Sequence, residues 1–230
     1  ESAGGEANVI VMGDHGQDLH HTTVRLNNWL AETGQLTFAD GNTSAFDWTR
    51  TRACIMGNGL YLNVAGRDPK GIVDPSDSSG LLEELCHGLC RITDPRTGER
   101  VVLIAAPREH FAYLGGHGQG AGDIVFCLQS GYQGRNDRGP MFEITRPWQE
   151  FTSGHDHFWP LDPRVQTRMF AAGPYFRSTS QPMRLRPIVD VAPTIAAVLG
   201  IDVPPDIDGV AIAEVLVEPT AARDLQQASL

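Results

Sequence analysis

The sequence lacks a long apolar run, an excess of basic residues and a secretion signal, and each absence excludes a class of protein. No stretch approaches the roughly 20 apolar residues that a membrane-spanning helix needs, and the start ESAGGEAN has no basic region followed by an apolar one. Lys and Arg number 18 against 28 Asp and Glu, a formal net charge of -10. Nucleic-acid binders depend on clustered cations. We therefore expect a soluble chain with no membrane span that does not wrap nucleic acid.

Cysteine is also scarce. The four cysteines, Cys54, Cys86, Cys90 and Cys127, form no Cys-x-x-Cys pair and no dense framework, so a disulfide scaffold is not expected at this length. Cys86 and Cys90 lie four residues apart, with His87 between them, in the segment LLEELCHGLC, whose apolar spacing is that of an amphipathic helix. We interpret this pair as core packing rather than as metal ligands.

Composition and patterning predict one α/β domain over residues 1–230. Apolar residues make up 41% and charged residues 20% of the chain, which is ordinary for a globular protein, and no internal repeat or change of composition divides it. Apolar periodicity and turn residues predict strands over 8–12, 53–64 (two pieces about a Gly-Asn-Gly turn), 101–105, 123–128 and 168–172, and helices over 22–33, 78–91 and 193–199. The glycine-rich segments 115–122 and 130–140 are expected to be long loops that shape a substrate entrance.

The motif Gly13-Asp14-His15-Gly16 follows the first expected strand, which we predict to be buried. Side chains just beyond the carboxyl end of a strand line the usual ligand crevice of α/β proteins. A carboxylate and an imidazole on adjacent residues, in a turn that the flanking glycines allow, can bind one Zn²⁺. The motif is short, and simple turn formation is the alternative. Further ligands would come from other histidines, the candidates being His20, His21, His110, His117, His155 and His157.

Longer stretches of the chain resemble a known family. The family's order of segments is matched by VIVMGDHGQ, LNNWLAETG, DWTRTRACIMGNGLYLNVAGRDPKGIV, LCRITDPRTGERVV, GDIVFCLQSGYQ, MFAAGPYF and IVDVAPTIAAVLGIDVPPDIDGV. In this order they resemble bacterial phosphohydrolases of the alkaline phosphatase superfamily, in the branch of type I phosphodiesterases and nucleotide pyrophosphatases. The resemblance covers nearly the whole chain. It implies a bacterial source and the C-terminal part of an alkaline-phosphatase-like α/β fold, with a mostly parallel sheet and helices on both faces.

The resemblance also implies a site with two divalent metal ions, expected to be zinc. Asp14 and His15 match the family's Asp-His pair, which binds the metal that also holds the nucleophile, although Gly13 stands where serine is usual. A later histidine in a Gly-x-His context binds the second metal in the family. The spacing from the last expected strand favours His157, whereas the local Ser-Gly-His sequence favours His155. We prefer His157, and expect the other histidine to support a ligand or contact substrate.

Other polar residues are further candidates for functional or structural roles. His117, between two glycines, is a candidate substrate contact. Arg67 and Lys70 have the charge to bind phosphate, but we prefer a turn that anchors the domain. For His20 and His21, just before the first helix, we prefer a surface or capping role.

The function implied by the resemblance is that of a metal-dependent phosphohydrolase acting on small phosphoesters. An acidic protein that handles phosphate takes its positive charge from metal ions, which agrees with this expectation. The family's Ser or Thr nucleophile and its remaining ligands have no match here. We therefore expect them in a missing N-terminal half of the same protein, and expect this fragment alone to be inactive. A phosphomutase or phosphotransferase of the same superfamily, or an inactive assembly or binding module, are the alternatives.

Overall fold

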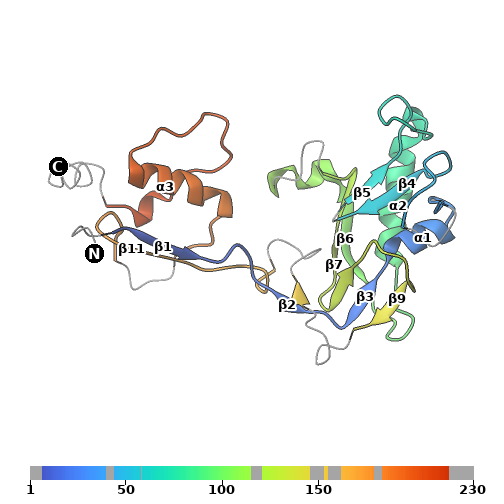
Figure 1. Cartoon of the computed structure of the whole chain (residues 1–230), viewed down its shortest axis with the longest axis horizontal. Coiled ribbons are helices and arrows are strands. Elements are labelled where there is room, and N and C mark those ends of the chain that lie inside the picture. The colour runs from blue at the N-terminus through green and yellow to red at the C-terminus, as the bar shows by residue number, and fades with distance from the viewer. Residues whose placement is uncertain are drawn as a thin grey trace. The chain divides into compact units, whose positions relative to one another are not determined.

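The computed structural model describes residues 7–39, 44–57, 59–114, 121–145, 153–154, 162–178 and 183–217. Over these residues the chain is a mixed α/β protein, as the sequence predicts (Figure 1). It divides into two compact units, of which unit 1 combines Glu1–Asp14 with Thr167–Leu230 and unit 2 is His15–Gln166. Units of this kind occur within one domain as well as between domains, so the prediction of a single domain stays a prediction.

Unit 2 contains a four-stranded sheet with the strand order β4-β5-β7-β6. The hairpin of β4 (Ala53–Met56) and β5 (Gly59–Leu62) confirms the two strand pieces predicted there. β7 (Ile124–Leu128) pairs with β5 on one side and with β6 (Val102–Pro107) on the other, so both of these predicted strands are also confirmed. Every pair in this sheet is antiparallel.

The helix predicted over 78–91 is confirmed as α2 (Ser78–Arg91), which packs against β6 (Figure 1). Its buried face is formed by Leu81, Leu85 and Leu89, four residues apart, and by Cys86. Because this spacing places the side chains on one side of a helix, α2 buries one face and leaves the other in solvent.

The helix predicted over 22–33 is too long at its start. The helix α1 is Leu26–Glu32, and Thr22–Val24 forms the strand β3 instead. β3 pairs in parallel with β8 (Tyr132–Gly134) and antiparallel with β9 (Phe142–Ile144). Two threonines and a valine are β-branched and suit a strand, and pairing with two distant strands overrides the helical spacing.

The sheets correct one expectation of the resemblance. β3 and β8 are the one parallel pair of named strands in the part of the chain that the structure describes, and the other ladders are antiparallel. The described residues are therefore α/β, but they do not form the mostly parallel sheet that was expected. β8 also lies inside segment 130–140, which we expected to be a loop throughout.

The main hydrophobic core lies in unit 2 and joins α1, α2 and the four-stranded sheet. Its fully covered side chains include Leu30, Leu60, Leu85, Leu89, Ile124, Phe126, Leu128 and Tyr132. Cys86 belongs to this core, as predicted, whereas Cys90 is only partly buried.

Unit 1 contains the ribbon of β1 (Val9–Met12) and β11 (Met169–Ala172) and the helix α3 (Val191–Leu199) (Figure 1). All three confirm predicted elements. α3 ends at Gly200, whose φ of +66° is the left-handed conformation that glycine adopts without strain. The buried core of unit 1 is small, formed by Phe176, Ile212 and Val215.

The strand before Asp14 is not buried, which corrects a second expectation. Val9 and Val11 are 50% and 61% exposed, and Phe170 on β11 is 67% exposed. Among the described residues β1 pairs with β11 alone, so no further strand covers its other edge. An apolar run predicts burial only when neighbouring elements supply the cover.

The structure also has two-residue strands β2 (Asp18–Leu19) and β10 (Ser153–Gly154). Short 3-10 helices lie at η1 (Pro75–Asp77), η2 (Arg108–Leu114), η3 (Ile188–Asp190) and η4 (Ala213–Val215). None of the helices in the described ranges is long and apolar enough to cross a bilayer.

Candidate metal-binding loop

Asp14 and His15 lie in the loop that leaves β1, as predicted. The Asp14 side chain is exposed and that of His15 is half-buried. Nδ1 of His15 lies 2.8 Å from the carbonyl oxygen of Gly16. This contact favours the tautomer with its proton on Nδ1, in which Nε2 carries the lone pair that binds a metal. A carboxylate oxygen and an imidazole nitrogen are both ligands that zinc accepts.

Gly16 determines how closely this loop approaches the turn that precedes β11. Its N–H donates to the carbonyl oxygen of Val165 at 2.7 Å. A Cβ at this position would lie 2.0 Å from the carbonyl oxygen of Arg164, far closer than two such atoms can come. The need for glycine here arises from this close approach of backbone to backbone.

Asp18, on β2, holds the other end of the loop. Its Oδ2 accepts a hydrogen bond from Ser130 Oγ at 2.6 Å and lies 3.1 Å from Arg164 Nη1. Arg164 also pairs with Asp162, and this charged hydrogen bond holds the pKa of the Asp162 carboxyl below its usual range. Three contacts with separate segments thus hold the loop after His15, one from Gly16 to Val165 and two from Asp18, to Ser130 and to Arg164.

Sequence reasoning missed Asp18, Ser130 and Arg164. The one available signal was the repeated tripeptide Asp-Pro-Arg, at 94–96 and 162–164. In both copies the aspartate accepts the arginine's backbone N–H, at 2.9 Å, and also pairs with its guanidinium. The tripeptide predicts a local turn with a fixed arginine, but not that Arg164 reaches Asp18.

The strand β10 places a predicted segment beside the loop. It pairs antiparallel with β2, with Gly154 opposite Asp18. Gly154 directly precedes His155 in the sequence. The described part of the Ser-Gly-His segment therefore runs along the residues that follow His15. His155, His157 and His117 themselves lie outside the described residues.

Of the two histidines before α1, His21 has the surface position that was expected and His20 does not. His20 is fully buried, so its predicted surface or capping role is wrong. His21 is exposed, and its Nδ1 lies 2.9 Å from Thr22 Oγ1. Neither residue caps α1, whose N-terminal cap is Arg25. His110 is exposed on η2.

Arg67 confirms the preference for an anchoring turn over phosphate binding. Its guanidinium makes a two-pronged ion pair with Asp123, at 2.7 and 2.9 Å, and also pairs with Asp68. The hydrogen bonds that Arg67 donates to Asp123 raise the pKa of Arg67. The backbone carbonyl of Lys70 accepts from Asn63 Nδ2 at 2.8 Å, which ties down the same turn. Protein groups therefore occupy the donors of Arg67.

Over the described ranges no three His, Cys, Asp or Glu side chains gather closely enough to hold a metal ion. Asp14 and His15 thus supply two candidate ligands, and the predicted third, His155 or His157, falls outside those ranges. No protein-family model and no curated protein matches the chain. The family resemblance consequently depends on the sequence segments alone.

Proposed function

We propose that the chain is part of a metal-dependent phosphohydrolase acting on small phosphoesters, as phosphodiesterases and nucleotide pyrophosphatases do. In this proposal Asp14 and His15 bind one divalent metal ion, zinc by the chemistry of its ligands. The observation that carries the proposal is the pairing of Gly154 with Asp18, because it brings the segment before the predicted third ligand beside the loop of the first two.

The local chemistry fits a zinc ligand pair. Oxygen and imidazole nitrogen are ligands that zinc accepts, and metal-binding histidines usually hydrogen-bond through the second ring nitrogen, as His15 does with Gly16. The close backbone approach of Gly16 to Arg164 and the contacts of Asp18 hold the residues after His15 in place. A loop that is already ordered loses less entropy when it binds an ion.

When bound, a pair of such metal ions lowers the pKa of a hydroxyl nucleophile and stabilises the leaving oxygen of the phosphoester. This chain's part is to hold the ions through Asp14, His15 and either His157 or His155. Its net charge of -10 would otherwise repel a phosphoester, so the ions also supply the attraction. The proposal includes an alkaline-phosphatase-like fold for the whole protein, with the Ser or Thr nucleophile in its missing N-terminal half.

Zinc binding by this chain is the first test. We expect Asp14→Asn and His15→Ala each to weaken zinc binding in calorimetric titrations at least about tenfold, because losing even a supporting partner of a ligand costs that much. His87→Ala and Asp202→Asn, exposed residues outside the loop, should leave the affinity unchanged. Variants with wild-type affinity would contradict the ligand assignment, and absence of zinc from the protein with its natural upstream sequence would favour an inactive module.

Activity is the second test, made on the protein with its natural upstream sequence. The wild type should hydrolyse p-nitrophenyl phosphate or bis(p-nitrophenyl) phosphate, and Asp14→Asn should lower kcat/KM by about 10³-fold, because an ion contributes several kcal/mol to the transition state. Full zinc content with unchanged turnover in the variant would reject the role of Asp14. Transfer of the phosphoryl group to an added alcohol rather than to water would indicate a phosphotransferase instead.

A further inference from the structure

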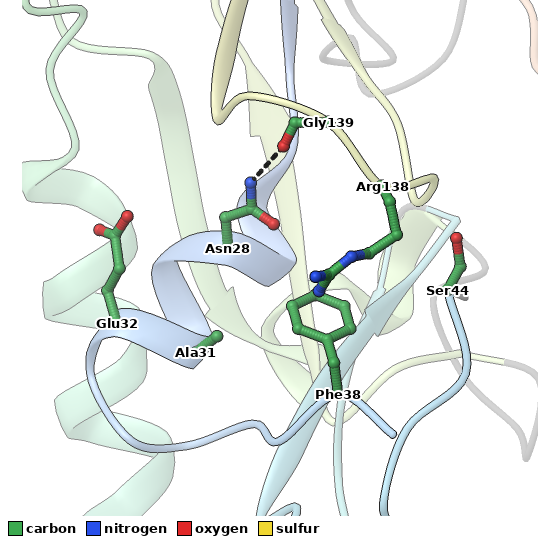
Figure 2. Close-up of a pocket in the computed structure, with 7 residues that line it drawn as sticks. All are labelled: Asn28, Ala31, Glu32, Phe38, Ser44, Arg138 and Gly139. Carbon is green, nitrogen blue, oxygen red and sulfur yellow. Dashed lines mark hydrogen bonds between the residues drawn. The ribbon is translucent and has the colours of Figure 1, made fainter. Parts of the chain in front are cut away.

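A pocket of about 800 Å³ lies against α1 in unit 2, away from the loop of Asp14 and His15 in the sequence (Figure 2). Its volume is in the range of small-molecule sites, roughly 300 to 1,000 Å³. Three segments line it, with Asn28, Ala31 and Glu32 from α1, Phe38 and Ser44 from the segment after α1, and Arg138 and Gly139 from the segment before β9.

Arg138 is held in place by aromatic rings. Its guanidinium lies 4.0 Å from the centre of the Phe38 ring, the geometry of a cation–π contact. Phe38 contacts Phe46, with ring centres 5.9 Å apart, and Phe46 meets Trp48 edge-on at 5.5 Å. A backbone bridge also joins Phe38 and Phe46. The cation therefore lies against Phe38, whose ring packs on Phe46 and through it on Trp48.

The donors of Arg138 are not used by the described part of the protein. The guanidinium makes no ion pair or hydrogen bond with any described residue, and its contact there is with the ring of Phe38. The adjacent carboxylate, Asp137, is engaged by Arg25 at 3.0 Å. The N–H groups of a guanidinium lie in its plane, and those of Arg138 can therefore bind a carboxylate or phosphate with two hydrogen bonds.

The opposite side of the pocket carries a negative charge. Glu32 is exposed and has no ion pair among the described residues. In Figure 2, Glu32 and Arg138 stand on the two sides, with Asn28 and Ala31 between them. The amide of Asn28 is fixed by its donation to the carbonyl oxygen of Gly139 at 2.8 Å, which leaves its own oxygen as an acceptor.

We propose that this pocket binds a small zwitterion of the amino-acid type, with its carboxylate on Arg138 and its ammonium group on Glu32. A ligand with a single charge would pair with one of these two side chains and leave the other without a partner from the ligand, whereas a zwitterion pairs with both. Ala31 and the edge of Phe38 provide the apolar wall for the carbon chain between the two charges. This inference does not depend on the proposed phosphohydrolase function.

The test is a titration of the ¹⁵N-labelled chain with ω-amino acids of increasing length, from glycine to 6-aminohexanoate, with acetate and methylammonium as probes of one charge each. We expect amide shifts at Phe38, Ser44 and Gly139, a Kd of about 1 mM or tighter for the best chain length, and binding at least about tenfold weaker for both single charges. Absence of binding by every zwitterion, or acetate binding as tightly as the best one, would overturn the proposal.

Substitutions of the two charged side chains test whether the zwitterion binds between them. Arg138→Gln and Glu32→Gln should each weaken the best zwitterion at least about tenfold, because each removes one charge-assisted contact. Arg135→Gln and Glu83→Gln make the same chemical changes at exposed residues outside the pocket, and should leave the Kd unchanged. Wild-type affinity in either pocket variant, or equal losses in the matched controls, would show that binding does not occur between Arg138 and Glu32.

Discussion

Gly16 is the residue on which the shape of the candidate metal loop depends most directly. A methyl group there would meet the carbonyl oxygen of Arg164 at 2.0 Å. We expect Gly16→Ala to lower the free energy of unfolding by about 1–3 kcal/mol, as other overpacked sites do. Urea unfolding followed by circular dichroism measures this.

Gly80 provides the matched control for that substitution. It lies in α2, and a Cβ added there meets nothing within 4 Å. Gly80→Ala should therefore raise stability by up to about 1 kcal/mol, since alanine favours the helix. If Gly16→Ala proved as harmless as Gly80→Ala, the close approach of the two backbone segments would be refuted.

The cysteines differ in reactivity because they differ in burial. Burial raises the pKa of Cys54 to about 12, and the pKa of Cys86 and Cys127 to about 11. The reactive species is the thiolate, so these three should resist iodoacetamide at pH 8, while the partly buried Cys90 reacts first. Peptide mass spectrometry after timed labelling measures the order. All four should react in urea, and labelling of Cys54 as fast as Cys90 in the native protein would contradict the burial.

Among the elements, the segment before β9 and the start of α1 are joined by one buried arginine. Arg25, 7% exposed, donates to Asp137 at 3.0 and 3.1 Å and to Glu143 at 2.8 Å. These bonds connect the N-terminal cap of α1 with β9 and with the segment that carries Arg138. They therefore also support one side of the proposed zwitterion pocket.

This ion pair predicts a pH dependence. The hydrogen bonds from Arg25 lower the pKa of Asp137, so its contribution to stability is present above the ordinary Asp pKa of about 4 and is lost as the pH falls through the lowered value. Asp137→Asn should lower the free energy of unfolding by under about 1 kcal/mol at pH 7, since the carboxyl is more than half exposed. Below pH 4 the variant should lose less stability than the wild type as the pH falls.

Urea unfolding at pH 7, 5, 4 and 3 provides the measurement for Asp137, with the exposed Asp202→Asn as the control. The control should follow the wild-type curve at every pH. If the stability of Asp137→Asn fell with pH as steeply as that of the wild type, the contact with Arg25 would contribute nothing to stability.

Some helices and strands could be predicted from sequence patterns, and others could not. α2 and the β4–β5 hairpin were predicted because an amphipathic repeat and a tight turn are local signals. β3 was missed because its strand state depends on β8 and β9, more than a hundred residues away. In the site, Asp14 and His15 were found from a motif, whereas Asp18 had no local signal.

At the scale of the whole molecule, the two units have very different cores. Unit 2 buries an extended cluster that includes Leu60 and Phe126, while the buried cluster of unit 1 is Phe176, Ile212 and Val215. Hydrogen-exchange mass spectrometry should therefore show amides of β5 and β7 exchanging at least about 100-fold more slowly than those of β1 and β11. Equal protection in both units would show that unit 1 has stabilising contacts beyond its described core.

The sequence by itself determined the helices α2 and α3, the hairpin and the place of Asp14 and His15 after a strand. All of these depend on side-chain periodicity or on contacts within a short stretch of chain. Only the tertiary structure decided the exposure of β1, the antiparallel sheets and the contacts of Asp18 with Ser130 and Arg164. Those two partners lie 112 and 146 residues away along the chain. Burial and long-range pairing depend on which distant segments meet, and a local pattern does not encode that.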